Sequence, residues 1–514
     1  MLSKGYAAAL QGINSIIVTV ESSVNRGFSF VLVGLGDTAV KESKERITSA
    51  LRQVGLEFPH TNVLVNLAPA DVKKEGSAYD LPIAIAVMVA DGQIKFDDFD
   101  KYVIMGELSL DGSVLPVKGI LPMAIAARNA GFKGMIVPMA NATEAAVVDR
   151  LEIYGVEHIR QVLEFATSGT GPRRVEVDTR AEFEKARLNC DLDFADVKGQ
   201  ESVKRAFEVA CAGGHNIILV GPPGAGKSMM AKRLPSIMPP FTLHEALETT
   251  KIHSVAGRLP EGSMLMTSRP FRSPHHTVSP VALVGGGTNP MPGEISLAHN
   301  GILFLDEFPE FSRQVLEVLR QPVEDRHITV SRAKYSVDYP ASFMLVASMN
   351  PCPCGYYNHP TKPCTCQPGA IRRYLDRVSG PLLDRIDIQC EIAPVPFEKL
   401  SSLEKGEPSA AIRARVMAAR EIQNERFRSI PGVYCNAQMS PKMLAEWCRL
   451  DKECLAAVEY AMKKFDMSAR AYDRILKVSR TIADLDASPA IALRHVSEAI
   501  GYRRLDRSSW GRIF

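Results

Sequence analysis

The stretch GPPGAGKS, at residues 221–228, has the residue types and the spacing that can hold a chain of phosphates. It matches G-x-x-x-x-G-K-[ST] in full and lies between an apolar run, NIILV, and a segment with helical periodicity. Glycines let backbone N–H groups surround phosphate oxygens, while Lys227 neutralises the β and γ oxygens and Ser228 reaches Mg²⁺. We therefore expect ATP to contact the whole loop: Gly221, Pro222, Pro223, Gly224, Ala225, Gly226, Lys227 and Ser228.

Two acids end the next apolar run of this region, ILFLDE at 302–307. At the end of a buried strand after a phosphate loop, Asp306 is expected to hold the Mg²⁺ shell and Glu307 to orient and deprotonate the attacking water. Asn350 ends the following apolar run, FMLVASMN, and is expected to touch the γ-phosphate or the water. A simple cap at the end of a strand is the alternative for Asn350.

An arginine with a possible catalytic role precedes a further apolar run, in LLDRIDI at 382–388. The guanidinium of Arg385 could stabilise the charge that develops on ATP bound by a neighbouring subunit. A surface ion pair with Asp384 or Asp387 is the alternative.

These residues need strands and helices to position them, and the sequence predicts an α/β fold in both of its first two regions. Residues 1–166 alternate β-rich apolar runs with helical patterns, and 167–190 is a polar stretch that is typical of a linker. Residues 191–395 carry continuous apolar runs between helices, which predicts a parallel sheet. Residues 396–514 show helical periodicity alone and predict a helical domain.

Composition narrows the class of protein. The 514 residues suggest about three domains at roughly 150 residues each. A net charge of +3 is nearly neutral, so any contact with nucleic acid must come from local basic stripes. The longest apolar stretch, LPIAIAVMVA, is too short to span a bilayer, and no signal peptide is evident. We expect a cytoplasmic protein with no membrane contact.

Four of the ten cysteines lie within 352–366, as two C-x-C pairs: Cys352, Cys354, Cys364 and Cys366. Four thiolates in a short Pro- and Gly-rich segment can close a tetrahedral Zn²⁺ site, and four protein ligands indicate a structural role. His359 could replace one ligand, and reduced thiols or an iron–sulfur cluster are the alternatives. His275 and His276 have no acid or cysteine near them in sequence, so packing or hydrogen bonding is expected there rather than a metal.

A basic hairpin is predicted in HITVSRAKYSVDYP, where apolar residues alternate on both sides of Arg332-Ala333-Lys334. Basic side chains at a hairpin tip suit sequence-independent contacts with a nucleic-acid backbone, so Arg332 and Lys334 are the candidate DNA contacts. An exposed hairpin with a solvated tip is the alternative.

The order of these motifs, together with RPFRSPHH, NPCPCG and GPLLDRID, resembles AAA+ ATPases of the magnesium-chelatase and MCM-helicase lineage, and within it the YifB/ComM family. The resemblance implies sensor 1 at Asn350, the arginine finger at Arg385, and sensor 2 at Arg470, with Arg474 as its alternative. It also implies a homo-hexameric ring with ATP between subunits. The implied function is a DNA helicase for branch migration of recombination intermediates in natural transformation.

Residues 63–138 resemble the proteolytic domain of Lon, which uses a Ser/Lys dyad. An ungapped match puts Ala78 at the nucleophile, and GILPMAIAA lacks the lysine of the base, although Ser77 and Lys118 lie nearby. The resemblance therefore implies a Lon-like (S5-type) α/β domain without its dyad, serving as a scaffold or in DNA contact. The other hypotheses are a magnesium-chelatase motor subunit and an ATP-dependent protein remodeller or protease.

Overall fold

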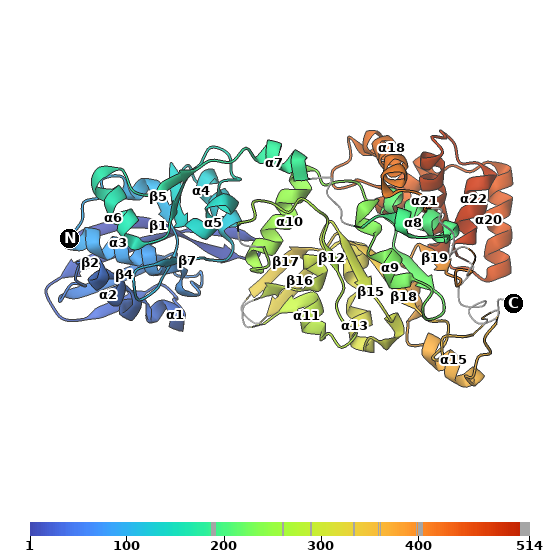
Figure 1. Cartoon of the computed structure of the whole chain (residues 1–514), viewed down its shortest axis with the longest axis horizontal. Helices are drawn as coiled ribbons and strands as arrows, with labels where there is room; N and C mark the ends of the chain where they lie inside the picture. The colour runs from blue at the N-terminus through green and yellow to red at the C-terminus, as the bar shows by residue number, and fades with distance from the viewer. Residues whose placement is uncertain are drawn as a thin grey trace. The chain divides into compact units, whose positions relative to one another are not determined.

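The structure is a computed structural model that describes residues 1–186, 192–259, 262–287, 290–332, 335–357, 359, 361–396, 398 and 405–503. The chain divides into two units (Figure 1), the first comprising Met1–Ala186 with Thr242–Thr267 and the second Arg187–Phe241 with Ser268–Phe514. Each unit carries a sheet and helices, which confirms the predicted α/β class.

The first unit is built on an eight-stranded sheet with the order β10-β9-β8-β5-β1-β2-β4-β3. Its strands are β1 (Leu2–Gln11), β2 (Asn14–Asn25), β3 (Phe30–Val33), β4 (Asn62–Ala68), β5 (Tyr102–Ile104), β8 (Gly134–Pro138), β9 (Glu152–Val156) and β10 (Arg173–Val175). A small hairpin joins β6 (Glu107–Leu108) to β7 (Val114–Leu115). The helices are α1 (Thr38–Lys41), α2 (Ser43–Gln53), α3 (Asp80–Asp91), α4 (Ile120–Asn129), α5 (Met139–Ala145), α6 (Ile159–Ser168) and α7 (Thr179–Ala186).

The segment 167–190 has more structure than its polar composition suggests. Within it, β10 pairs antiparallel with β9, and α7 follows. The predicted boundaries at 166, 190 and 395 stay predictions.

One helix of the first unit comes from far along the chain. Helix α10 (Leu243–Val255) begins at Thr242, whose side chain and that of Glu245 cap each other's backbone N–H groups. Near its end, the Ser254 hydroxyl donates to the buried carboxyl group of Glu144 at 2.5 Å, and the Ser254 carbonyl accepts from Gly119 N–H at 3.2 Å. Burial raises the pKa of Glu144. The helix is therefore docked on α4 and α5.

The second unit contains a five-stranded sheet with the order β12-β15-β18-β11-β19, all parallel. The strands are β11 (Ile217–Val220), β12 (Phe271–Arg272), β15 (Ile302–Leu305), β18 (Met344–Met349) and β19 (Ile388–Glu391). Strands β11, β15 and β18 are buried along their whole length, as expected for apolar runs in a parallel sheet.

Short helices and two hairpins surround this sheet. The helices before the carboxyl-terminal region are α8 (Glu201–Gly213), α9 (Lys227–Ala231), α11 (Pro280–Val284), α12 (Glu294–Leu297), α13 (Arg313–Val318), α14 (Arg320–Asp325), α15 (Pro368–Leu375) and α16 (Gly380–Leu383). One hairpin pairs β13 (Gly285–Gly286) with β14 (Met291–Pro292), and the other pairs β16 (His327–Arg332) with β17 (Tyr335–Pro340).

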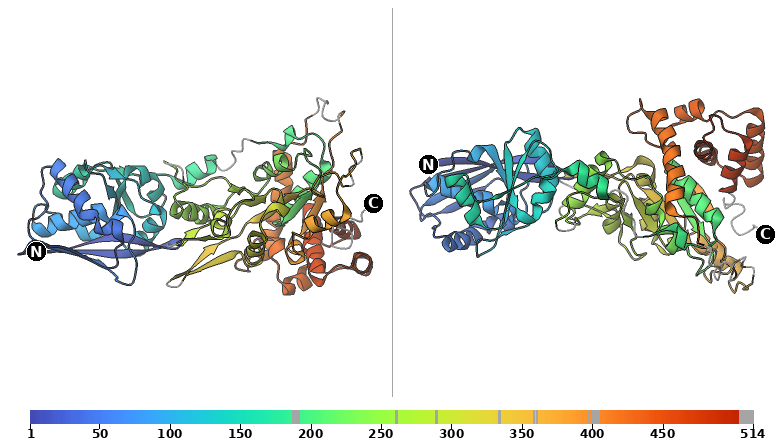
Figure 2. Two further views of the ribbon diagram at one scale, coloured as in Figure 1. Left: turned by 90° about the horizontal axis from the view of Figure 1, so that it is seen from below. Right: turned by 45° about the horizontal axis from the view of Figure 1, so that its top comes forward.

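The carboxyl-terminal region is helical, as predicted. It contains α18 (Ser409–Phe427), α19 (Pro441–Trp447), α20 (Lys452–Phe465), α21 (Ala469–Leu485) and α22 (Leu493–Gly501). Figure 2 shows these orange and red helices gathered beside α8, and their buried apolar residues form one core with those of α8 and β11. The helical region is therefore packed onto the sheet layer rather than separate from it.

Candidate active site

Three neighbouring strands bring the predicted ATP site together. Because β15, β18 and β11 are adjacent and parallel, their carboxyl ends meet at one edge of the sheet. The phosphate loop follows β11, the acid pair Asp306-Glu307 follows β15, and Asn350 follows β18. Ligands of open parallel sheets bind at this edge.

Lys227 lies at the centre of the loop. Its Nζ donates to the carbonyl oxygens of Gly221 at 2.7 Å and Pro222 at 3.0 Å, and to the Asn350 side chain at 2.9 Å. Burial lowers the pKa of Lys227, and the negative charges of Asp306 and Glu307 oppose that shift. The contact with Asn350 puts the proposed sensor beside the lysine that is expected to hold the β and γ oxygens.

The predicted magnesium ligands are already in contact. Ser228 Oγ donates to one carboxylate oxygen of Asp306 at 2.5 Å, and Ser348 Oγ donates to the other. Ser228 and Asp306 therefore form a pair of oxygen donors of the kind that Mg²⁺ prefers. Ser348 orients Asp306 from the next strand; no motif in the sequence pointed to it.

Glu307 has a neighbour that the sequence did not predict. His276 Nδ1 lies 3.4 Å from Glu307 Oε2, and the His276 ring contacts that of His275 with centroids 4.0 Å apart. Glu307 is 58% exposed and has a φ of 53°, so its side chain is held at the edge rather than in the core. The histidine comes from the loop after β12, the edge strand beside β15. Such a contact can orient the expected general base.

Arg385 lies at the other edge of the same sheet. Arg385 precedes β19, and the first residue of β19 pairs with the first residue of β11. The phosphate loop follows the other end of β11. The length of a four-residue strand, about 13 Å, therefore separates Arg385 from the level of the phosphate loop. Its guanidinium is largely buried, donating to Glu324 at 2.7 Å and to the Pro381 carbonyl at 2.7 Å. Neither Asp384 nor Asp387 is its partner in these contacts. Arg385 and the phosphate loop of the same chain therefore lie at opposite edges of the sheet.

The two candidates for sensor 2 differ in their surroundings. Arg470 is exposed in the first turn of α21. Arg474, one turn later, contacts the buried carboxylate of Asp387 at 3.0 Å. Burial raises the pKa of Asp387, but the charge of Arg474, the neighbouring His215 ring and the hydrogen bond from Asn216 N–H outweigh it and hold that pKa well below its usual range. Arg474 is thus committed to an ion pair, which favours Arg470 as the arginine that meets ATP.

The four predicted cysteine ligands converge. The Sγ atoms of Cys352, Cys354, Cys364 and Cys366 all lie within 4.8 Å of one another. The distances from Cys364 Sγ to those of Cys352 and Cys354 are 3.7 and 3.5 Å, close to the roughly 3.8 Å that two ligands of one tetrahedral zinc ion require. His359 is not in this cluster, and its Nδ1 accepts from Lys362 N–H at 3.0 Å.

The cysteine loop also touches the phosphate loop. Gly355 has a φ of 82°, and a Cβ added there would lie 2.4 Å from the Pro223 ring. Glycine is therefore required for both its conformation and this close approach. The cysteine loop therefore supports Pro223 of the phosphate loop. Along the chain it lies between Asn350 and β19.

The other predicted residues are positioned as follows. Arg332 is the last residue of β16, paired with Tyr335, while Lys334 lies outside the described residues. In the Lon-like unit, Ser77 opens a short 3₁₀ helix and the Lys118 side chain approaches Gly257. Both are described, and no hydrogen bond joins them. No contact thus supports a shifted Ser/Lys dyad.

Three family models match this chain. Magnesium chelatase, subunit ChlI, matches residues 193–400; subunit ChlI of Mg-chelatase matches 20–141; and the ChlI C-terminal model matches 406–503. The second and third matches extend the likeness well beyond the nucleotide-binding sheet.

Individual relatives match over nearly the whole chain. The competence protein ComM of Haemophilus influenzae is 42% identical over 509 residues, which cover 98% of this chain and 97% of that protein. The uncharacterised protein YifB of Salmonella typhimurium is 41% identical over 504 residues, which cover 98% of this chain and 97% of that protein.

A further match covers only part of the chain. Lon protease 1 of Herpetosiphon aurantiacus is 30% identical over 165 residues, which cover 29% of this chain and 20% of the protease. In the part of the chain that the structure describes, no helix is long and apolar enough to cross a membrane.

Proposed function

This chain belongs to the family of the YifB and ComM proteins, and we propose that it is an AAA+ motor that uses ATP hydrolysis to migrate branched DNA recombination intermediates. Membership of this magnesium-chelatase-like AAA+ lineage indicates ATP hydrolysis. The name of the ComM relative, a competence protein, supports a role in natural transformation.

One observation carries the motor proposal. The phosphate loop, Asp306, Glu307 and Asn350 share the carboxyl edge of the sheet, whereas Arg385 is at the amino edge. A complete ATP site would then need Arg385 from a second copy, as in a ring with ATP between subunits. Repetition of such an interface would close a ring, which in this proposal is a homo-hexamer.

ATP and Mg²⁺ have a defined place in this proposal. The backbone of 221–226, Lys227 and Asn350 would bind the phosphates, and Ser228 with Asp306 would hold Mg²⁺. Glu307 would take the proton of the attacking water. Bound Mg²⁺ supplies charge stabilisation for the transferred phosphoryl group.

DNA is the proposed track because of the hairpin β16–β17. Its strands pair from His327 with Pro340 to Arg332 with Tyr335, so Arg332 belongs to the last described pair before the turn of the hairpin. Arg332 and Lys334 would hold the phosphate backbone in the ring without reading sequence.

The test is ATP hydrolysis by the purified protein without DNA and with single-stranded DNA, duplex or a four-way junction. The same samples report conversion of the junction into forks. We expect strong stimulation by DNA and ATP-dependent migration of the junction. If the protein forms rings and its ATPase rate is the same with and without each DNA, a chelatase-type motor or a protein remodeller is favoured instead. The match to the magnesium chelatase family is consistent with either of these functions.

We further propose that the four cysteines hold a structural zinc ion, since four soft thiolate donors converge on one point. The purified protein is expected to contain about one zinc per chain by elemental analysis. Replacing Cys364 and Cys366 together by serine should remove it and raise the KM for ATP several-fold, because Gly355 would no longer support Pro223.

A matched control is Cys448→Ala, which removes a buried thiol outside the cluster and should keep the zinc. Iron in place of zinc would indicate an iron–sulfur cluster. Full metal content in the double variant would rule out these ligands.

A further inference from the structure

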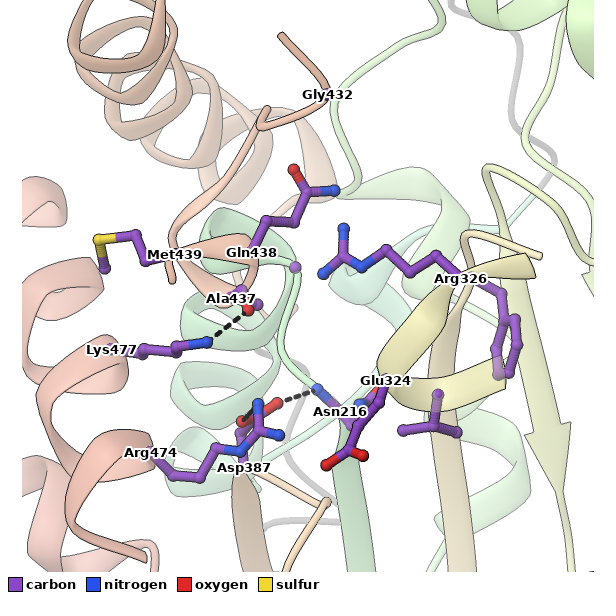
Figure 3. A pocket seen from close by; sticks show the side chains of 13 residues that line it. Asn216, Glu324, Arg326, Asp387, Gly432, Ala437, Gln438, Met439, Arg474 and Lys477 are labelled. Carbon is purple, nitrogen blue, oxygen red and sulfur yellow. Dashed lines mark hydrogen bonds and ion pairs between the residues drawn. The ribbon is translucent and has the colours of Figure 1, made fainter. Parts of the chain in front are cut away.

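A polar cavity of about 320 Å³ lies in the second unit, at the amino edge of its sheet. Figure 3 shows it between the start of β11, the junction of α14 with β16, the loop before α19, and α21. Asn216 and Asp387, each immediately before a strand, form part of its wall. Because the phosphate loop follows the carboxyl end of β11, this cavity is separate from the ATP site.

Positive charge dominates the lining. Arg326, Arg474 and Lys477 face the acids Glu324 and Asp387. Both acids are already engaged, since Asp387 pairs with Arg474 at 3.0 Å and Glu324 with Arg385 at 2.7 Å. Among the described residues, no carboxylate lies within ion-pair distance of Lys477 or Arg326, although Asp387 is near both.

Lys477 is held in place but not neutralised. Its Nζ donates to the Ala437 carbonyl at 3.0 Å, as the dashed line in Figure 3 marks. Burial, together with the charges of Arg474 and Arg326, lowers the pKa of Lys477 to about 8, and Asp387 only partly opposes them. An anion bound here would relieve this repulsion.

Arg326 aims into the cavity from the opposite side. It follows α14 with a φ of 59°, and Figure 3 shows its guanidinium directed towards the Gln438 side chain. Burial lowers the pKa of Arg326, opposed by the nearby Cys435 and Asp387. An arginine fork, an ammonium group and a side-chain amide line this one cavity, and such donors are the ones with which proteins recognise phosphoryl groups.

We propose that this cavity is a second phosphate-binding site, which takes a phosphoryl group through Arg326, Lys477 and Gln438. The group could belong to a free polyphosphate or to the backbone of a single-stranded nucleic acid. The site would exist whether or not the ring moves DNA.

The test uses the full chain carrying Lys227→Ala, so that the ATP site does not contribute. Inorganic pyrophosphate is titrated by calorimetry, and a labelled single-stranded oligonucleotide by fluorescence anisotropy. Adding Arg326→Gln or Lys477→Gln is expected to weaken binding at least tenfold in one of the two arms, and the affected arm identifies the source of the phosphate. Lys452→Gln, the same charge change at an exposed helical position, is the control. Equal binding by all three variants in both arms would overturn the proposal.

A second measurement leaves the cavity intact. Acetylation of Lys477 is followed by mass spectrometry in the Lys227→Ala protein, with and without saturating pyrophosphate or oligonucleotide. Pyrophosphate or the oligonucleotide should slow acetylation of Lys477 several-fold, and neither should slow acetylation of Lys452. An unchanged rate at Lys477 with both would equally refute the site, even if the cavity variants fold poorly.

Discussion

Glu307→Gln is expected to abolish ATP turnover while ATP stays bound. The amide keeps the size and much of the hydrogen bonding of the carboxylate, but it cannot accept the proton of the attacking water. Loss of a general base lowers kcat on the order of 10²–10⁴-fold. Binding should persist because the loop, Lys227 and Asn350 are untouched. Steady-state ATPase assays and equilibrium binding of labelled ATP measure the two effects.

The matched control for this variant is Glu310→Gln. Glu310 is an acid three residues on, 43% exposed and paired with Arg377 at 2.7 Å, so it shares the charge change but not the place in the site. It should hydrolyse ATP at close to the normal rate. If Glu307→Gln did so too, the role assigned to Glu307 would be wrong, and His276, 3.4 Å away, would be the next base to test.

Arg385→Ala is expected to lower the ATPase rate on the order of 10³-fold, the scale of an arginine finger, because charge on the transferring phosphoryl group loses its stabilising partner. The same loss should follow from Lys227→Ala for a different reason, since that variant cannot hold the phosphates. Arg373→Ala, which removes an exposed arginine of α15, is the control and should stay active.

Mixing the two inactive variants separates action on the neighbour from action within one subunit. In a mixed ring, some sites combine an intact phosphate loop from an Arg385→Ala chain with an intact Arg385 from a Lys227→Ala chain. Activity should therefore return in part on mixing. If the rings are shown to contain both variants and still remain inactive, Arg385 does not act on the ATP of a neighbouring chain.

The parts of the site that the sequence predicts are those with local signals. GPPGAGKS is continuous, Asp306 and Glu307 together end one apolar run, and Asn350 ends another. The carboxyl ends of parallel strands lie at one edge of their sheet. A prediction of neighbouring parallel strands is therefore enough to bring Lys227 near Asn350. The cysteine cluster has the same local character, because all four thiols come from one short loop.

The contacts that the sequence does not predict join segments far apart in the chain. His276 meets Glu307, Gly355 meets Pro223, and Glu324 meets Arg385 only because the segments between different strands pack against one another. No periodicity or spacing encodes such pairs. The placement of α10 in the first unit is of the same kind: its capping box predicts where the helix begins, but not the surface on which Ser254 finds Glu144.

Because α10 is part of the first unit, the chain passes between the two units three times: after Ala186, after Phe241 and after Thr267. The Lon-like unit is thus not an appendage that a single cut could release. An enzyme shortened to begin after residue 186 would keep α10 yet lose α4 and α5, leaving Ser254 without Glu144. A nucleotide-binding unit transferred alone would need a replacement for residues 242–267, which lie between two of its own segments but belong to the first unit.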